Sequence, residues 1–241
     1  MTNPTGSVTA TLTVPPRPGT ATWSTLAAGM LIDMDGTLVD SLVDSTQAVE
    51  RQWHTFLTWY DLPPEALPHP LHGKRAEDHI RALLPPRLAD DGLARFIELE
   101  TQDTDGIPAV PGAAELLAAL DDAGLPWAVV TSGTRPVVQA RLAAAGLPQP
   151  AVVVTAEDVT RGKPDPEPYL TGATRLGVRG PLVAIEDAPA GVRSAQAAGC
   201  LVIALHTTNP PAQLIGAALT LPDLQPLRVT KRPGRSSAMF R

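Results

Sequence analysis

The sequence has a single cysteine, Cys200, so a disulfide cannot form within the chain. Disulfides are rare in cytoplasmic proteins, and this lack makes a cytoplasmic location the simplest expectation. Positive charge is also scarce, since 19 Lys and Arg residues against 25 Asp and Glu residues give a net charge of −6. Without a broad basic excess, we expect no nucleic-acid partner. No stretch is apolar and long enough to span a bilayer, and we expect no membrane partner.

Charge is almost missing from residues 1–26, where Arg17 is the one charged side chain. These residues are rich in Thr and Pro, and they lack the basic start and long apolar run of a signal peptide. We therefore expect residues 1–26 to form a disordered extension. At the other end, basic residues cluster, and we expect residues 229–241 to be a basic, solvated tail.

From about residue 30 onward, short apolar runs alternate with helical patterns. This alternation predicts an α/β fold, a doubly wound parallel sheet with helices on both faces. The runs that we interpret as strands are Met30–Ile32, Trp127–Val130, Val152–Val154, Leu182–Ile185 and Leu201–Leu205. Residues 41–110 break the rhythm with helical patterns and no convincing strand. We predict a core domain of residues 27–40 and 111–228, with residues 41–110 inserted as a small helical cap.

Two aspartates, Asp33 and Asp35, follow the first of these runs, and Gly36 comes directly after them. Side chains at i and i+2 of a strand project to the same side, so both carboxylates can act on one substrate. One could attack as a nucleophile while the other transfers a proton. Two adjacent anions need a cation, and Mg²⁺ with oxygen ligands is the natural choice beside a phosphate. An isolated Asp-x-Asp-Gly is about equally consistent with a calcium-loop fragment or an ordinary turn.

Further polar groups follow the later runs, where ligands of open parallel sheets bind. Thr131-Ser132-Gly133 offers a hydroxyl and backbone N–H groups to a phosphate, although the same residues are common in turns. Lys163 lies in a proline-containing loop and could neutralise phosphate, although most lysines are simply solvated charges. Glu186 and Asp187 could complete a magnesium site, or they could cap the following helix.

In this order, these motifs resemble those of the haloacid dehalogenase-like hydrolases over about residues 30–208. The resemblance implies a Rossmann-like core and an aspartyl-phosphate mechanism, with Asp33 as nucleophile and Asp35 as general acid and base. It implies that Thr131 and Lys163 bind the phosphoryl group, with Ser132 and Gly133 beside them. It also implies a set of Mg²⁺ ligands, which are Asp33, the Asp35 carbonyl, Asp187 and Glu186, the last directly or through water.

About 30 residues separate Thr131 from Lys163, which leaves room only for the helical type of cap. His72-Gly73-Lys74-Arg75 resembles the substrate-specificity loop of helical-cap enzymes, and we expect these four residues to contact substrate. His69, His72 and His79 could suggest a transition-metal site, but ordinary surface histidines fit their spacing better.

The motifs look most like those of glycerol-phosphate and sugar-phosphate phosphatases. We therefore expect a Mg²⁺-dependent phosphatase that acts on a small phosphorylated metabolite, as a monomer or a weak homo-oligomer. A sugar phosphomutase of the β-phosphoglucomutase type shares Asp33, Asp35 and the cap, so it remains an alternative. Phosphonate hydrolysis and dehalogenation fit less well because Asp35 is present. A non-catalytic regulator would retain the fold, but no catalytic group is missing here.

Overall fold

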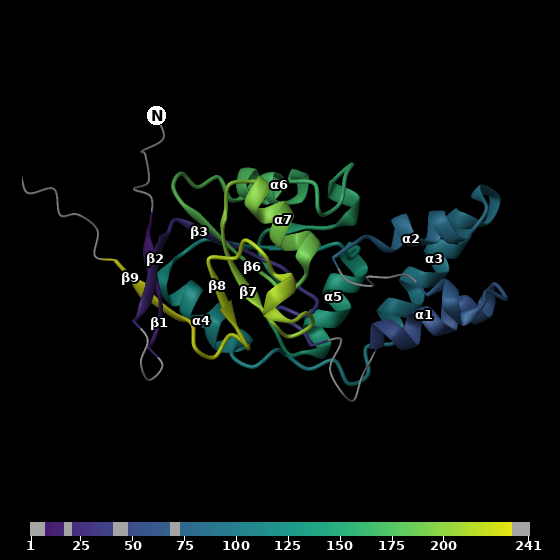
Figure 1. The fold of residues 1–241 in the computed structure, drawn as a ribbon, viewed down its shortest axis with the longest axis horizontal. Helices are drawn as coiled ribbons and strands as arrows, with labels where there is room; N and C mark the ends of the chain where they lie inside the picture. Colours follow the sequence, from purple (N-terminus) through teal and green to yellow (C-terminus); the bar gives the residue numbers. More distant parts are fainter. Residues whose placement is uncertain (1–7, 17–20, 41–47, 68–72, 233–241) are drawn as a thin grey trace, which may run out of the picture.

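The computed structural model describes residues 8–16, 21–40, 48–67 and 73–232. Within these ranges, a parallel sheet occupies the middle of an elongated molecule. Three helices lie at one end of the molecule, and a small antiparallel sheet lies at the other end (Figure 1). Among the described helices, none has the length and apolar character needed to cross a bilayer.

The central sheet has the strand order β5-β4-β3-β6-β7-β8, and all five pairings in it are parallel. Its strands are β3 (Gly29–Ile32), β4 (Trp127–Val130), β5 (Val153–Val154), β6 (Leu182–Glu186), β7 (Leu201–Leu205) and β8 (Leu219–Leu221). The first five correspond to the predicted strands within one residue at each end. The predicted fold class is confirmed, and β8 is an additional edge strand that the sequence pattern did not indicate.

Helices cover both faces of this sheet. They are α4 (Ala113–Ala123), α5 (Arg135–Ala144), α6 (Glu167–Leu176) and α7 (Pro189–Ala197). Alternate residues of β3 serve the two faces, since Met30 and Ile32 join the apolar cluster with α4 and α5, whereas Leu31 joins the cluster with α6 and α7. All three side chains are fully buried, which explains why the strand is apolar throughout.

The inserted unit contains α1 (Ala48–Trp59), α2 (Ala76–Leu83) and α3 (Pro86–Gln102). Its helices have an apolar core of their own, in which the rings of Trp53 and Phe96 lie 4.4 Å apart and Phe56 contacts both. Helix α3 also packs against α5 of the core domain. This inserted unit, called the cap below, lies within residues 41–110, where the sequence predicts a helical cap, and its action as a cap stays a prediction. Short 3₁₀ helices at Pro64–Ala66, Ala156–Asp158 and Pro211–Gln213 complete the described elements.

The prediction that residues 1–26 are disordered is wrong for two segments. β1 (Ala10–Val14) pairs antiparallel with β2 (Trp23–Ala27) on one side and with β9 (Arg228–Lys231) on the other. Ala10 and Leu12 are fully buried and join the apolar cluster that includes α4. Their alternation with threonine is a strand pattern, but one of the two partner strands, β9, lies about two hundred residues later in the sequence.

The same pairing corrects the prediction of a solvated tail at residues 229–241. Residues 229–231 belong to β9, so only the residues after it could form such a tail. Residues 1–7 and 233–241 lie outside the described residues.

Candidate active site

The predicted catalytic residues meet at one edge of the central sheet, because parallel strands end on the same side. Asp33 follows β3 and Thr131 follows β4. Glu186 is the last residue of β6, and Asp187 comes directly after it. A cavity of about 170 Å³ opens between this edge and the cap. Asp33 and Asp35 both line it, as the spacing of the two carboxylates predicted.

A tight turn after β3 holds the two aspartates. The carbonyl of Met34 accepts hydrogen bonds from the backbone N–H groups of Thr37, Leu38 and Val39 at 3.2, 2.8 and 3.0 Å. Gly36 has a φ of 80°, and a Cβ at this position would lie 2.3 Å from Asp187 Oδ2. Glycine is therefore required here both by the backbone conformation and by the space left beside Asp187.

The ammonium group of Lys163 lies among anions in the interior of the site. It donates hydrogen bonds to Asp33 Oδ1, to Glu186 Oε1 at 2.6 Å and to the Val130 carbonyl at 3.0 Å, while its side chain is 1% exposed. Burial alone would lower the pKa of Lys163, but the charges of Asp33 and Glu186 outweigh burial and raise it. Lys163 is therefore a permanent cation beside Asp33, although it does not itself line the cavity.

Glu186 is fully buried and has several hydrogen-bond donors around it. Besides Lys163, the hydroxyl of Tyr169 donates to its Oε1 at 2.7 Å, and the N–H groups of Asp187 and Ala188 donate to its Oε2 at 3.1 and 3.3 Å. Gly191 on α7 makes room for this carboxylate, since a Cβ there would lie 1.8 Å from Glu186 Oε1. These contacts fix the orientation of Glu186.

Asp187 is held by residues that the sequence patterns did not single out as site residues. The hydroxyls of Thr37 and Thr208 donate to its two carboxylate oxygens, the former at 3.3 Å, and Asn209 Nδ2 donates to its carbonyl at 3.2 Å. Burial and the nearby charge of Glu186 raise the pKa of Asp187 to about 7. A divalent cation bound beside Asp187 would offset the repulsion between its carboxylate and that of Glu186.

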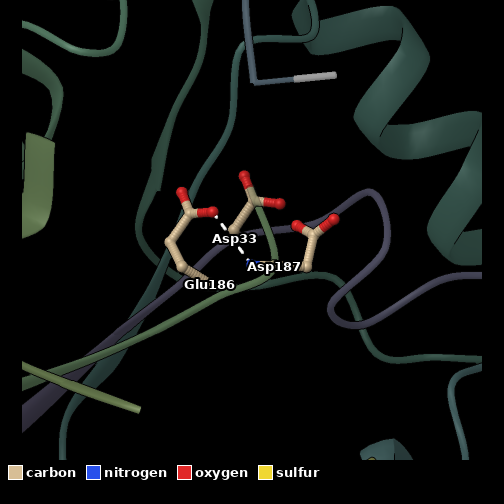
Figure 2. A group of neighbouring side chains, drawn as sticks. All are labelled: Asp33, Glu186 and Asp187. Atoms are coloured by element: carbon tan, nitrogen blue, oxygen red, sulfur yellow. Dashed lines mark hydrogen bonds between the residues drawn. The ribbon is translucent and has the colours of Figure 1, made fainter. Parts of the chain in front are cut away.

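Three of the predicted metal ligands come together. Asp33, Glu186 and Asp187 each offer a carboxylate oxygen, and these oxygens lie within 4.8 Å of one another. Figure 2 shows the three carboxylates projecting to the same side of the strand ends. Burial raises the pKa of Asp33 well above its usual range, and its acidic neighbours raise it further, although Lys163 opposes them. An all-oxygen, anionic and partly uncompensated set of this kind fits a hard divalent cation such as Mg²⁺.

Residues 131–134 line the cavity from the core side. The Thr131 hydroxyl accepts a hydrogen bond from Gly133 N at 3.0 Å, which closes the turn. The hydroxyls of Ser132 and Thr134 are buried and have no hydrogen-bond partner among the described residues. Because a buried hydroxyl without a partner is costly, these two groups indicate a polar ligand in the cavity.

The structure adds Arg141 to the candidate site. Its guanidinium donates from Nη1 to Asp35 Oδ1 at 2.6 Å and from Nη2 to Glu100 Oε1 at 2.8 Å. The side chain is 3% exposed and lines the cavity. A signal was present in the sequence, because Arg141 lies on the buried face of α5 with Val138 and Leu142, where a charged residue needs a specific partner.

The predicted substrate loop is placed only in part. Gly73 and Lys74 line the cavity. Arg75 does not line it, because its guanidinium pairs with Asp78 at 2.8 Å and reaches the Val159 carbonyl at 3.4 Å. His72 lies outside the described residues, as does His69.

Comparisons with known proteins agree with this geometry. The profile of the family described as "Hydrolase: haloacid dehalogenase-like hydrolase" matches residues 28–199. Hexitol phosphatase A of Escherichia coli (strain K12) is 47% identical over 209 residues, which are 85% of this chain and 95% of that relative. Glycerol-1-phosphate phosphohydrolase 1 of Saccharomyces cerevisiae is 36% identical over 194 residues, 74% of each protein.

Among solved structures, a hydrolase from Pseudomonas syringae superimposes with a TM-score of 0.73 at 25% identity, over 82% of this chain and 94% of that one. The profile match covers the parallel sheet from β3 through α7 together with the inserted cap. The chain belongs to the haloacid dehalogenase-like hydrolases.

Proposed function

We propose that this phosphoric monoester hydrolase releases phosphate from a small sugar or polyol phosphate through an aspartyl phosphate on Asp33. The observation that carries the proposal is the position of Asp33, which lines the cavity with Asp35 and contacts Lys163 behind it. A nucleophile, a proton donor and a fixed cation in one buried site are the groups that phosphoryl transfer needs.

In the first step, an Asp33 oxygen forms a bond to phosphorus while the bond from phosphorus to the ester oxygen breaks. Asp35 gives its proton to the departing oxygen, and it then takes a proton from the water that hydrolyses the aspartyl phosphate. Lys163 compensates the charge of Asp33 throughout. Asp33, Asp187 and Glu186 are the residues that would hold Mg²⁺, whose charge would stabilise the negative phosphoryl oxygens.

The volume and the charged lining residues of the cavity support a compact substrate. Its volume of about 170 Å³ is small beside the roughly 300–1,000 Å³ of pockets for drug-sized ligands. Among the described lining residues, Lys74 is a cation with no carboxylate in ion-pair distance, whereas Arg141 is already paired with two. A second phosphate would also meet Glu77 and Glu157, so an uncharged polyol chain suits this lining better.

A screen of phosphate esters tests this function. Purified protein with Mg²⁺ should release phosphate from hexitol and glycerol phosphates with a higher kcat/KM than from nucleoside monophosphates. Asp33→Asn should abolish turnover, and removal of Mg²⁺ with a chelator should do the same. Equal turnover by wild type and Asp33→Asn would contradict the mechanism.

The same assay separates the phosphatase from the phosphomutase. Incubation with glucose 1-phosphate and a trace of glucose 1,6-bisphosphate should give free phosphate and no glucose 6-phosphate beyond a no-enzyme control. Isomerisation without net phosphate release would instead establish a mutase.

The proposal also includes a cytoplasmic location and a monomer or weak homo-oligomer. The single cysteine supports the location, since oxidising compartments favour paired cysteines. Cell fractionation tests the cytoplasmic location. Light scattering over a range of concentrations tests the oligomeric state, and a stable oligomer at low concentration would contradict a monomer or weak homo-oligomer.

A further inference from the structure

One buried side chain joins the core domain, Asp35 and the cap. Arg141 projects from α5, and besides its bonds to Asp35 and Glu100 it donates from Nη2 to Gln52 Oε1 at 3.2 Å. Glu100 belongs to α3 and Gln52 belongs to α1, so a single guanidinium connects two cap helices to the turn after β3.

One of the two cap partners, Gln52, is itself fixed. Gln52 is fully buried, and its Nε2 donates to the Asp103 carbonyl at 2.8 Å. The carboxylate of Asp103 in turn accepts two hydrogen bonds from Arg51, at 2.6 and 3.0 Å. The Gln52 acceptor that the cap offers to Arg141 therefore has little freedom to move. The guanidinium is planar and rigid, so acceptors that fix Nη2 also fix the direction in which Nη1 donates to Asp35.

Asp35 depends on this contact for its orientation. Among the described residues, Arg141 provides the one hydrogen bond that the Asp35 carboxylate makes, and it involves Oδ1. The Asp35 side chain is 19% exposed, so packing alone does not fix the rotation of its carboxylate. In the described structure, Arg141 supplies the contact that fixes it. With Oδ1 accepting from Arg141, Oδ2 is the oxygen that carries the proton in the acid form of Asp35 and gives it to the substrate.

We propose that Arg141, held by Glu100 and Gln52 of the docked cap, is a positioning residue that orients the Asp35 carboxylate for proton transfer to the leaving oxygen. The inference rests on the proposed function and adds a coupling to it, since Asp35 is correctly oriented only while the cap supplies the two acceptors. The proton passes from Asp35 Oδ2 to the ester oxygen as its bond to phosphorus breaks, and Arg141 keeps its own protons.

Leaving-group dependence distinguishes this role from a merely structural one. An alkoxide needs a proton as it leaves, whereas 4-nitrophenolate is stable without one. A misplaced acid therefore slows phosphoryl transfer from a hexitol phosphate much more than from 4-nitrophenyl phosphate. Weaker cap docking or partial unfolding would lower both rates by the same factor. The relevant constant is kcat/KM, because it reports the first transfer step and not the later hydrolysis of the aspartyl phosphate.

The experiment measures kcat/KM of Arg141→Met for both esters. We expect a loss of about 100-fold with the hexitol phosphate and less than about 10-fold with the aryl ester, in line with typical contributions of positioned acids. The quantity compared is the ratio of kcat/KM for the aryl ester to kcat/KM for the hexitol phosphate. Glu100→Gln and Gln52→Met should raise this ratio by smaller factors than Arg141→Met. Asp35→Asn should give the largest ratio and serves as the reference.

Arg175→Met is the matched control, because Arg175 forms an ion pair with Asp158 on the core surface and does not line the cavity. Its ratio should equal that of the wild type. If circular dichroism shows that Arg141→Met is unfolded, Arg141→Lys takes its place, since lysine keeps the charge but lacks the planar fork whose donors reach acceptors on three elements. An Arg141→Lys ratio shifted towards that of Asp35→Asn supports the proposal.

Equal losses on the two esters, in whichever Arg141 variant folds, overturn the positioning role. Glycerol phosphate serves as the alkyl ester if the wild type prefers it. A wild type no more active than Asp33→Asn on any ester overturns the proposed function itself, whereas an active wild type with equal variant losses overturns only the role of Arg141.

Discussion

Replacement of Lys163 by methionine should destabilise the fold in a pH-dependent way. The Lys163 side chain is 1% exposed, and the side chains of its partners Asp33 and Glu186 are 9% and 0% exposed, so water cannot replace the ammonium group. Removing one partner of a buried ion pair costs about 3–5 kcal/mol. For a protein of this size, that loss lowers Tm by roughly 6–20 °C.

The pH dependence follows from the carboxylates left behind. Burial and the charge of Glu186 already raise the pKa of Asp33, and without Lys163 nothing opposes them, so Asp33 favours the folded state only while it is protonated. The variant therefore loses stability as pH rises, and its deficit relative to wild type should be larger at pH 8 than at pH 5. Adding Glu186→Gln to Lys163→Met should recover part of the loss at pH 8.

Urea unfolding at pH 5 and pH 8, with a chelator present so that no metal replaces the ammonium group, measures both effects. Arg175→Met removes a partly exposed ion pair and should cost less than about 1 kcal/mol. A Lys163→Met deficit that is equally small, or one that does not change between the two pH values, would refute the reasoning about buried charge.

Three further predictions concern the metal site, the glycine beside it and the small sheet. The pKa of about 7 at Asp187 lies above its usual value of 3.8, so Asp187 stabilises the metal-free fold most at low pH and this contribution is lost as pH rises through 7. Mg²⁺ needs the ionised carboxylate, and it should raise Tm more at pH 8 than at pH 6 in a thermal-shift assay. Gly191→Ala places a Cβ 1.8 Å from Glu186 Oε1, and we expect kcat to fall at least about 10-fold as the carboxylate is displaced. Leu12→Ala, in the fully buried position of β1, should cost about 2–5 kcal/mol in urea unfolding.

The controls for these predictions come from the same regions. Equal Mg²⁺ stabilisation at both pH values would contradict the raised pKa of Asp187. Gly146→Ala has open space around its Cβ but a φ of 67°, so it should lower stability through backbone strain and leave kcat unchanged. An equal loss of kcat in both glycine variants would argue against a steric cause at Glu186. Thr11→Ala, beside Leu12 but only half-buried, should cost much less than Leu12→Ala. If both cost nothing, β1 contributes little to folding.

The sequence alone determined five of the six strands of the central sheet, because apolar runs and helical periodicity are local properties. Parallel strands must end at a common edge, so the order of the motifs also led to the residues that the structure places together, such as Asp33, Lys163 and Asp187. The aspartate spacing likewise predicted that Asp33 and Asp35 share one cavity.

Only the tertiary structure revealed the small sheet and the link between cap and core. The strand at residues 10–14 pairs with the nearby residues 23–27 but also with residues 228–231, and nothing local in a Thr-rich segment indicates the distant partner. The contacts of Arg141 with Gln52 and Glu100 likewise join residues 89 and 41 positions apart in the sequence. Such contacts depend on how separate elements pack, and packing is a property of the whole fold that no short stretch of sequence specifies.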